Sequence, residues 1–188
     1  NLWRQNLIAS SFDHSNGMEV QVEERVVITG MGTINPLGHN TSETWQNALQ
    51  GVSGVGPITH FDASDMQVRI ACEVKGFNPE DYMSSREARR RDRFEQLATA
   101  ASKEAICQAG FMNGSLDLGR IGVMVSSAIG GVEAFKDAVL ASQQDGARRI
   151  SPFSIPMLMS NGAAGLIAID NGFQGPALSV VSACASGA

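Results

Sequence analysis

Cysteine, aromatic side chains and long apolar segments are all scarce in this sequence of 188 residues. The three cysteines form no CxxC pair and have no histidine at metal-ligand spacing, so the sequence supports neither a disulfide framework nor a zinc site. No run of about 18 apolar residues occurs, and the first twenty residues mix charged with apolar side chains, unlike a signal peptide. We therefore expect a cytoplasmic protein that does not bind membranes.

Positive charge is also in short supply. The net charge of -5 argues against general nucleic-acid binding, which needs a basic surface. With 43% hydrophobic and 18% charged residues, the composition is that of a globular domain with a real core. The sequence shows no low-complexity tract and no repeat. One or at most two compact units are expected.

Three short apolar runs predict strands: Arg25–Thr29, Ile121–Ser126 and Leu178–Ser182. Because helical or small-residue stretches separate these runs, the pattern predicts an α/β fold in which helices cover a largely buried sheet. Residues 52–84 are rich in glycine, proline, aspartate and serine, which is typical of excursions over the surface.

Two helices are indicated by their ends. Asn40 is a suitable N-cap with Glu43 in the capping-box position, and Gly51 is placed to end that helix. After Asp92, apolar residues recur at helical spacing, at positions 94, 97, 98, 101 and 105, until Gly110. The second pattern predicts a long helix with one apolar face.

The last predicted strand runs into six small residues that include a single thiol, Cys184. Small neighbours would let a thioester approach the sulfur closely, and a helix that begins here would aim its backbone amides at a thiolate. This arrangement suits a nucleophile. A buried and inert cysteine is the alternative, and the residues alone leave both interpretations open.

Two other patterns have simpler interpretations. Residues 30–32 (GMG) follow a predicted strand as in a dinucleotide-binding turn, but Asn35 stands where a third glycine or alanine is needed. Pro36 would also interrupt the helix that should follow. His39 and His60 lie in loop contexts, and we interpret both as surface residues.

One segment is strongly basic. Between positions 86 and 93, five arginines stand against Glu87 and Asp92, which gives a net charge of +3: Arg86, Arg89, Arg90, Arg91 and Arg93. Such a patch suits the docking of an acidic partner. The alternative is a solvated helix start in which arginines pair locally with Glu87 or Asp92.

From Arg25 onward the sequence resembles the amino-terminal half of the bacterial-type β-ketoacyl-[acyl carrier protein] synthase II family, in the thiolase-like superfamily. The matching stretches are RVVITGMGTINPLG (25–38), GVSGVGPITHFDAS (51–64), EARRRDRF (87–94), SSAIGGVE (126–133), ISPFSIPM (150–157) and VVSACASGA (180–188). The resemblance implies a thiolase-like layered α/β fold, a mixed sheet between helices, with residues 18–188 as its amino-terminal half. Residues 1–17 are taken as an extension, expected to be disordered.

The resemblance also implies roles for single residues. It makes Cys184 the acyl-accepting nucleophile, with its backbone amide in the oxyanion hole. It places Ile129 beside the acyl-chain pocket near a dimer interface and Phe153 in the neighbouring pocket segment, although ordinary core packing would explain either residue. It assigns carrier-protein docking to Arg86, Arg89 and Arg90. Departures from the family pattern at residues 127–128, Ser154 and Gly162 leave the acyl-length preference open.

The implied reaction is decarboxylative condensation of an acyl-cysteine with malonyl-[acyl carrier protein] in fatty acid elongation, by a homodimer with Leu178–Ser182 at its interface. No metal or redox cofactor is implied, since phosphopantetheine arrives on the acyl carrier protein. Two histidines, a lysine and a Gly/Phe-rich loop of the family have no match here, so we expect a fragment or one part of a split enzyme, inactive alone. A polyketide ketosynthase and a non-catalytic partner subunit remain alternatives, although Cys184 counts against the second.

Overall fold

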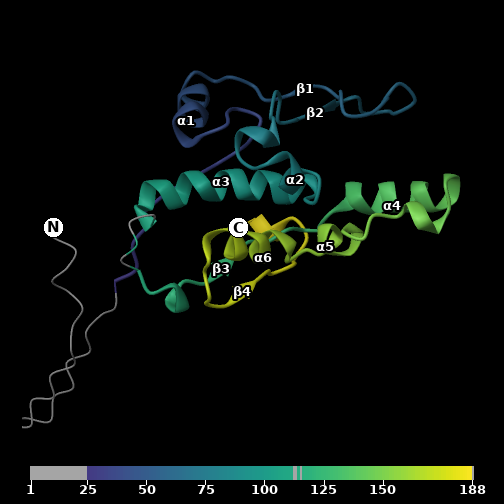
Figure 1. Ribbon diagram of the computed structural model, residues 1–188. Coiled ribbons are helices and arrows are strands. Elements are labelled where there is room, and N and C mark those ends of the chain that lie inside the picture. Colours follow the sequence, from purple (N-terminus) through teal and green to yellow (C-terminus); the bar gives the residue numbers. More distant parts are fainter. Residues whose placement is uncertain (1–24, 112–113, 115, 188) are drawn as a thin grey trace, which may run out of the picture.

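Helix α6 lies at the centre of the molecule. The computed structural model describes residues 25–111, 114 and 116–187, so the prediction for residues 1–17 lies outside the described residues. Figure 1 shows α6 (Gly162–Asn171) between α3 (Arg93–Ala109) on one side and the parallel strands β3 (Val123–Met124) and β4 (Ala177–Leu178) on the other. The core therefore has three layers: α3, α6 and the pair of strands β3 and β4.

Small side chains allow α6 to hold this position. Ala163, Ala164, Ile167 and Ala168 are all buried. A helix that is apolar on most sides is stable only when other elements cover it on more than one face. Alanine at three of the four buried positions keeps the covering elements close, and Ile167 adds the burial of one large side chain, about 1.5–3 kcal/mol.

The buried carboxylate of Asp92 caps two helices. Its Oδ1 accepts a hydrogen bond from the Phe94 amide (3.3 Å), and its own amide donates to Glu95 Oε2 (2.9 Å), which completes a capping box at the start of α3. Its Oδ2 accepts from the Ala134 amide (2.8 Å) in the first turn of α4 (Val132–Gln144). The predicted long helix is thus confirmed, and it ends at Gly110, which has a φ of 73°.

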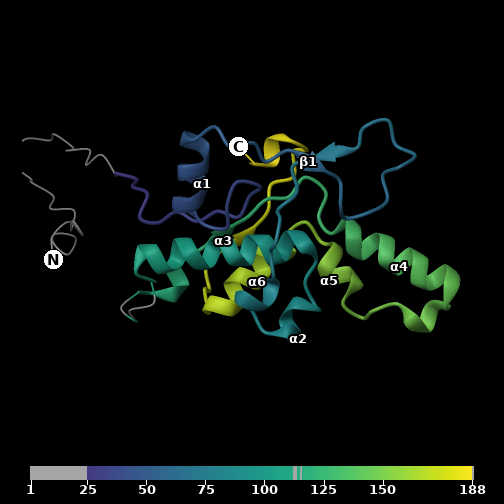
Figure 2. The ribbon, with the colours of Figure 1, turned by 90° about the horizontal axis from the view of Figure 1, so that it is seen from above.

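Helix α4 extends from the α2 end of α3, away from α6, in both views of the molecule (Figures 1 and 2). It is joined through η4 (Ala147–Arg149) to the short helix α5 (Ser154–Leu158), which packs against α4 and α6. The remaining short elements are α2 (Ser85–Ala88) and the single turns η1 (Pro79–Asp81), η3 (Leu118–Arg120) and η5 (Ala185–Gly187).

The segment that precedes α1 lies across the predicted apolar face of α3. A Cβ atom added at Gly30 would come within 2.2 Å of the Ala105 carbonyl oxygen, and one added at Gly32 within 2.0 Å of the Ala101 oxygen. Both glycines are therefore required because two backbones touch. This contact explains the GMG pattern without a dinucleotide.

Helix α1 (Thr41–Leu49) forms where its cap predicts. Asn40 Oδ1 accepts from the Glu43 amide (2.8 Å), but the Glu43 carboxylate accepts from the His39 amide (2.8 Å) and not from Asn40. Gly51 follows the end of the helix with a φ of 68°. No residue of α1 is buried, so its apolar side chains, including Trp45, face solvent.

The predicted sheet is only partly confirmed. Arg25–Thr29 forms no strand, and Val26 and Ile28 are 97% and 83% exposed, because no strand in the described part of the chain pairs with this run. The two later runs do pair in parallel, yet only through β3 and β4, with Val123 beside Ala177. A sheet of two strands cannot bury its edges, so the expectation of a largely buried sheet was wrong for the described residues.

The loop-rich region after α1 behaves as predicted. Its strands β1 (Gly56–Pro57) and β2 (Ile70–Ala71) form a short antiparallel pair, and most residues between them are exposed. Figure 1 places this pair on the side of α3 that faces away from α6.

Candidate active site

Cys184 lies six residues beyond Leu178, the last residue of β4, and directly before the turn η5. Ala183 has a φ of 52°, in the left-handed region that non-glycine residues rarely adopt. This residue turns the chain into η5, in which the amides of Ala185 and Ser186 donate to the carbonyls of Ser182 (3.2 Å) and Ala183 (3.0 Å). The Cys184 side chain is exposed, so the alternative of a buried cysteine is wrong for this structure. A backbone strained at this position is a feature that clusters at functional sites.

Access alone does not distinguish Cys184 from the other thiols. Cys72 and Cys107 are also free and exposed. Neither has small residues on both sides in the sequence: Cys107 lies within α3 beside Ile106 and Gln108, and Cys72 directly follows β2 and precedes Glu73. Any selectivity for Cys184 must therefore come from the chemistry around the sulfur.

Two hydrogen bonds fix the segment that carries Cys184. The Val180 amide donates to Ser126 Oγ (3.1 Å), and Ser179 Oγ donates to the Ser160 carbonyl (3.2 Å). The first bond joins this segment to the loop that carries Ile129, and the second joins it to the residues after α5. Ile129 itself is 69% exposed.

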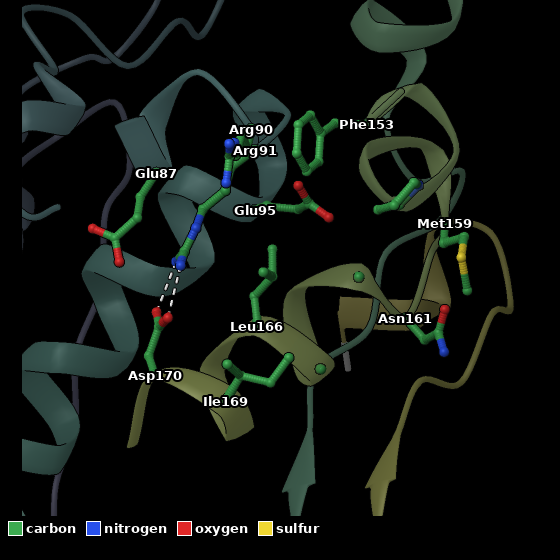
Figure 3. A pocket seen from close by; sticks show the side chains of 13 residues that line it. Glu87, Arg90, Arg91, Glu95, Phe153, Met159, Asn161, Leu166, Ile169 and Asp170 are labelled. Atoms are coloured by element: carbon green, nitrogen blue, oxygen red, sulfur yellow. Dashed lines mark hydrogen bonds and ion pairs between the residues drawn. The ribbon is translucent and has the colours of Figure 1, made fainter. Parts of the chain in front are cut away.

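Phe153 lines a cleft of about 520 Å³ that α2, α3, α5 and α6 enclose (Figure 3). The Arg90 guanidinium lies over its ring, 4.3 Å from the centroid, in a cation–π contact. Ile129 is not among the residues that line this cleft. The structure therefore brings Phe153 to the docking arginines and does not bring the two predicted acyl-pocket residues together there.

The basic segment divides into exposed and buried parts. Arg86 and Arg89 are exposed at α2 and its C-cap, and Arg90 is half-buried against Phe153. Arg93 instead lies over the Phe77 ring (4.8 Å) and donates to the Val74 carbonyl (3.3 Å). The exposed positive charge of this segment thus comes from Arg86 and Arg89, two of the three residues that the family resemblance selects.

Arg91 has a structural role and does not contribute to a docking surface. It is buried and makes two hydrogen bonds to the carboxylate of Asp170 on α6 (2.7 and 2.8 Å) and a third to Thr99 (2.9 Å). The hydrogen bonds to Asp170 raise the pKa of Arg91, so the guanidinium stays charged. Local pairing with Glu87 or Asp92 was expected as the alternative, but the partner lies far away in the sequence.

Arg89 lines a second hollow together with Arg149, which the sequence analysis did not select. This hollow, about 230 Å³, is lined by Arg89, Arg149, Asp137, Ser151 and Ser154 among others. The Asp137 Oδ1 atom lies 3.5 Å from Lys136 Nζ, so the negative charge of Asp137 is partly compensated. Two guanidinium groups at one hollow suit an anion such as a phosphate. The adjacent pair of arginines at 148–149 is the sequence signal that would have found Arg149.

The histidines and the acidic side chains form no metal site in the part of the chain that the structure describes. His39 Nε2 lies 2.8 Å from the Lys75 carbonyl oxygen, and its ring packs edge-on against Phe77. In the same residues no helix is long and apolar enough to cross a membrane.

Comparison with known proteins places this arrangement in a family. Residues 23–188 match the family model described as "Beta-ketoacyl synthase, N-terminal domain". The chain is 45% identical over 164 residues to 3-oxoacyl-[acyl-carrier-protein] synthase 2 of Staphylococcus aureus, covering 87% of this chain and 40% of the relative. It is 42% identical over 165 residues to the protein of the same name from Synechocystis sp., covering 88% and 40%. The chain thus spans about 40% of the length of these relatives.

Solved structures show the same fold. A beta-ketoacyl synthase from Burkholderia phymatum has a TM-score of 0.67 and 26% identity, covering 86% of this chain and 40% of that one. The ishigamide ketosynthase/chain length factor has a TM-score of 0.70 and 24% identity, covering 82% and 39%. These likenesses confirm the thiolase-like fold class. The chain belongs to the beta-ketoacyl synthase family, and residues 23–188 are its N-terminal domain.

Proposed function

We propose that this chain supplies the nucleophile of a 3-oxoacyl-[acyl carrier protein] synthase that acts in fatty acid elongation. The observation that carries the proposal is the placement of Cys184. Its exposed thiol directly follows a left-handed alanine, and its sequence neighbours at the start of a helical turn are small. The relatives named 3-oxoacyl-[acyl-carrier-protein] synthase 2 support this function over a polyketide pathway.

Two steps follow from a thiol in this position. The Cys184 thiolate attacks the carbonyl carbon of an acyl thioester, the C–S bond to phosphopantetheine breaks, and that thiol leaves as the acyl group becomes bound to Cys184. Malonyl-[acyl carrier protein] then loses carbon dioxide. The resulting carbanion attacks the acyl-Cys184 carbonyl, the Cys184 sulfur leaves as thiolate, and a 3-oxoacyl thioester is released. The Cys184 amide would stabilise the oxyanion in both attacks.

The proposal assigns the carrier protein to the basic surface formed by Arg86, Arg89 and Arg149. Arg86 and Arg89 are exposed on α2 and its C-cap, and Arg149 joins Arg89 at the same hollow. An acyl carrier protein is acidic and carries a phosphate on its arm, so this surface offers long-range attraction and two guanidinium groups for an anion. The complete enzyme is proposed to be a cytoplasmic homodimer. The exposed Leu178, Val180 and Val181 offer apolar surface for its interface.

Alkylation rates at the three cysteines test the role of Cys184. The chain is treated with limiting iodoacetamide or with cerulenin, and mass spectrometry follows the label at each thiol. Because all three thiols are exposed, access alone would give similar rates. We expect Cys184 to react roughly tenfold faster than the others because its surroundings activate the thiol. The variant Cys184→Ser should lose this fast phase, whereas Cys72→Ser and Cys107→Ser should keep it. Equal rates at the three thiols would contradict the proposal.

A further inference from the structure

The turn that carries Cys184 contains a backbone conformation that needs support. Ala183, directly before Cys184, has a φ of 52°, in the left-handed region. The Cβ of an alanine makes this conformation unfavourable, so such a residue persists only where the structure around it fixes its dihedral angles. Ala183 is exposed, so packing against a core does not hold it. The support has to come from hydrogen bonds within the turn.

Ser186 takes part in two of the three hydrogen bonds that close the turn within residues 182–186. Its amide donates to the Ala183 carbonyl (3.0 Å), and its Oγ accepts from the Ser182 amide (2.8 Å). The third bond runs from the Ala185 amide to the Ser182 carbonyl (3.2 Å). Ser186 therefore holds both residues that precede Cys184, and the thiol lies between the two ends that these bonds join.

The Ser186 hydroxyl is the one side-chain group among the described residues that forms a hydrogen bond within this turn. Ser186 is half-buried, whereas Ser182 and Cys184 are exposed, so the hydroxyl ties the turn together without covering the thiol. The chain that enters the turn is also held, because the Val180 amide donates to Ser126 Oγ (3.1 Å). With its entry fixed, the shape of the turn depends on the bond that Ser186 makes.

Two reactions at Cys184 make different demands on this turn. Alkylation by iodoacetamide is a displacement at a saturated carbon, for which the sulfur needs access and ionisation. Acyl transfer from a thioester passes through an oxyanion, and a donor stabilises that oxyanion only when it is held in place relative to the attacking sulfur. The peptide unit between Ala183 and Cys184 carries the proposed donor, so the conformation of the turn sets the direction in which that amide points.

We propose that Ser186 is a positioning residue for acyl transfer to Cys184. By accepting from the Ser182 amide, its hydroxyl keeps Ala183 in the left-handed conformation and thereby fixes the Cys184 amide relative to the thiol. The hydroxyl makes and breaks no covalent bond and does not contact the substrate. The inference rests on the proposed function of Cys184 and adds to it the residue that orders the oxyanion donor.

Rates of both reactions at Cys184 test the proposal, with S-phenyl thiooctanoate as the acylating probe, iodoacetamide as the alkylating probe and mass spectrometry as the readout. We expect Ser186→Ala to lower the acylation rate roughly tenfold and the alkylation rate less than about threefold. Ser186→Thr keeps the hydroxyl and should restore acylation to within about threefold of the wild type. Ser53→Ala removes an exposed hydroxyl that also accepts from a backbone amide, that of Val55 (3.2 Å), and should change neither rate.

Amide hydrogen exchange, followed by NMR, gives a second readout that does not depend on acyl transfer. Ser186→Ala should speed exchange of the Ser182 amide, and Ser53→Ala should leave that amide unchanged. An unchanged Ser182 exchange rate, equal losses of acylation and alkylation, or no recovery in Ser186→Thr would overturn the proposal. Equal acylation of the three cysteines in the wild type would refute the proposed function and this inference with it. Selective acylation of Cys184 that Ser186→Ala leaves unchanged would refute this inference alone.

Discussion

Glu95 and Gly162 form a pair in which each residue accounts for the other. A carboxylate with 1% exposure needs a neighbour without a side chain, and Gly162 provides that space. The capping box with Asp92 explains why an acidic residue stands at this position of α3, since it satisfies the Asp92 amide. The cap does not explain why the second oxygen has no donor. Burying that oxygen without a donor in the described part of the chain lowers the stability of the folded chain, and this loss can be measured.

The pH dependence of unfolding should show this cost. In the unfolded chain Glu95 titrates near its ordinary pKa of 4.5, whereas in the folded chain its pKa is about 7. Between these values the folded state holds more protons, so this group makes the free energy of unfolding decrease as pH rises from about 4.5 to 7. Each unit of pKa is about 1.4 kcal/mol, so the loss from pH 5 to 8 is at most about 3 kcal/mol.

Urea denaturation of the wild type and of Glu95→Gln at pH 5 and pH 8 measures that loss. We expect Glu95→Gln to be more stable relative to the wild type at pH 8 than at pH 5, by about 1–3 kcal/mol. A difference between the two proteins that is the same at both pH values would show that Glu95 keeps an ordinary pKa in the folded chain.

At the scale of elements, α3 organises its surroundings through its two faces. One face packs against the segment that precedes α1, at Gly30 and Gly32. The other face is joined to α6 through Thr99 and the Arg91–Asp170 pair. The apolar spacing of α3 predicts only the first face. The most buried residues of the helix, Glu95, Thr99 and Ala100, lie outside that spacing.

Alanine at Gly32 should disturb the first of these contacts. Its Cβ would come within 2.0 Å of the Ala101 carbonyl oxygen, so the segment must move away from α3. We expect a loss of about 1–3 kcal/mol in the free energy of unfolding, as for other overpacked sites. Gly165→Ala is the matched control, because its Cβ enters open space in a helix and should raise stability by up to about 1 kcal/mol. Equal effects of the two substitutions in urea denaturation would refute the close contact.

Local signals predicted the helices well and the sheet poorly, for a physical reason. Caps and glycine stops act within a few residues, so Asn40, Asp92 and Gly110 locate α1 and α3 directly from the sequence. A strand depends on its neighbours, and the run at 25–29 has none in the described residues, so its β-branched side chains remain exposed. Cys184 was selected by its small neighbours and by the family resemblance, whereas the strand predicted at Leu178–Ser182 is confirmed only at Leu178. The partner of Arg91 and the hollow shared by Arg89 and Arg149 depend on tertiary packing and could not be predicted.

At the scale of the whole molecule, an acidic chain presents a local basic surface. The net charge is -5, yet Arg86 and Arg89 are exposed near the hollow that Arg149 also lines. For an acidic partner, the overall charge is repulsive at a distance and the local charge is attractive at contact. Attraction at contact therefore has to orient the partner as well as hold it.

Charge reversal at this surface tests its proposed role in carrier-protein docking. We expect Arg89→Glu and Arg149→Glu each to raise the Kd for acyl carrier protein roughly tenfold at 25 mM salt, and the effect to shrink at 250 mM salt because exposed charges are screened. Arg120→Glu makes the same charge change on η3, which contributes nothing to this hollow, and should alter the Kd by less than about twofold. Surface plasmon resonance with immobilised carrier protein gives these values. If Arg120→Glu weakens binding as much as Arg89→Glu does, only net charge matters and the docking surface lies elsewhere.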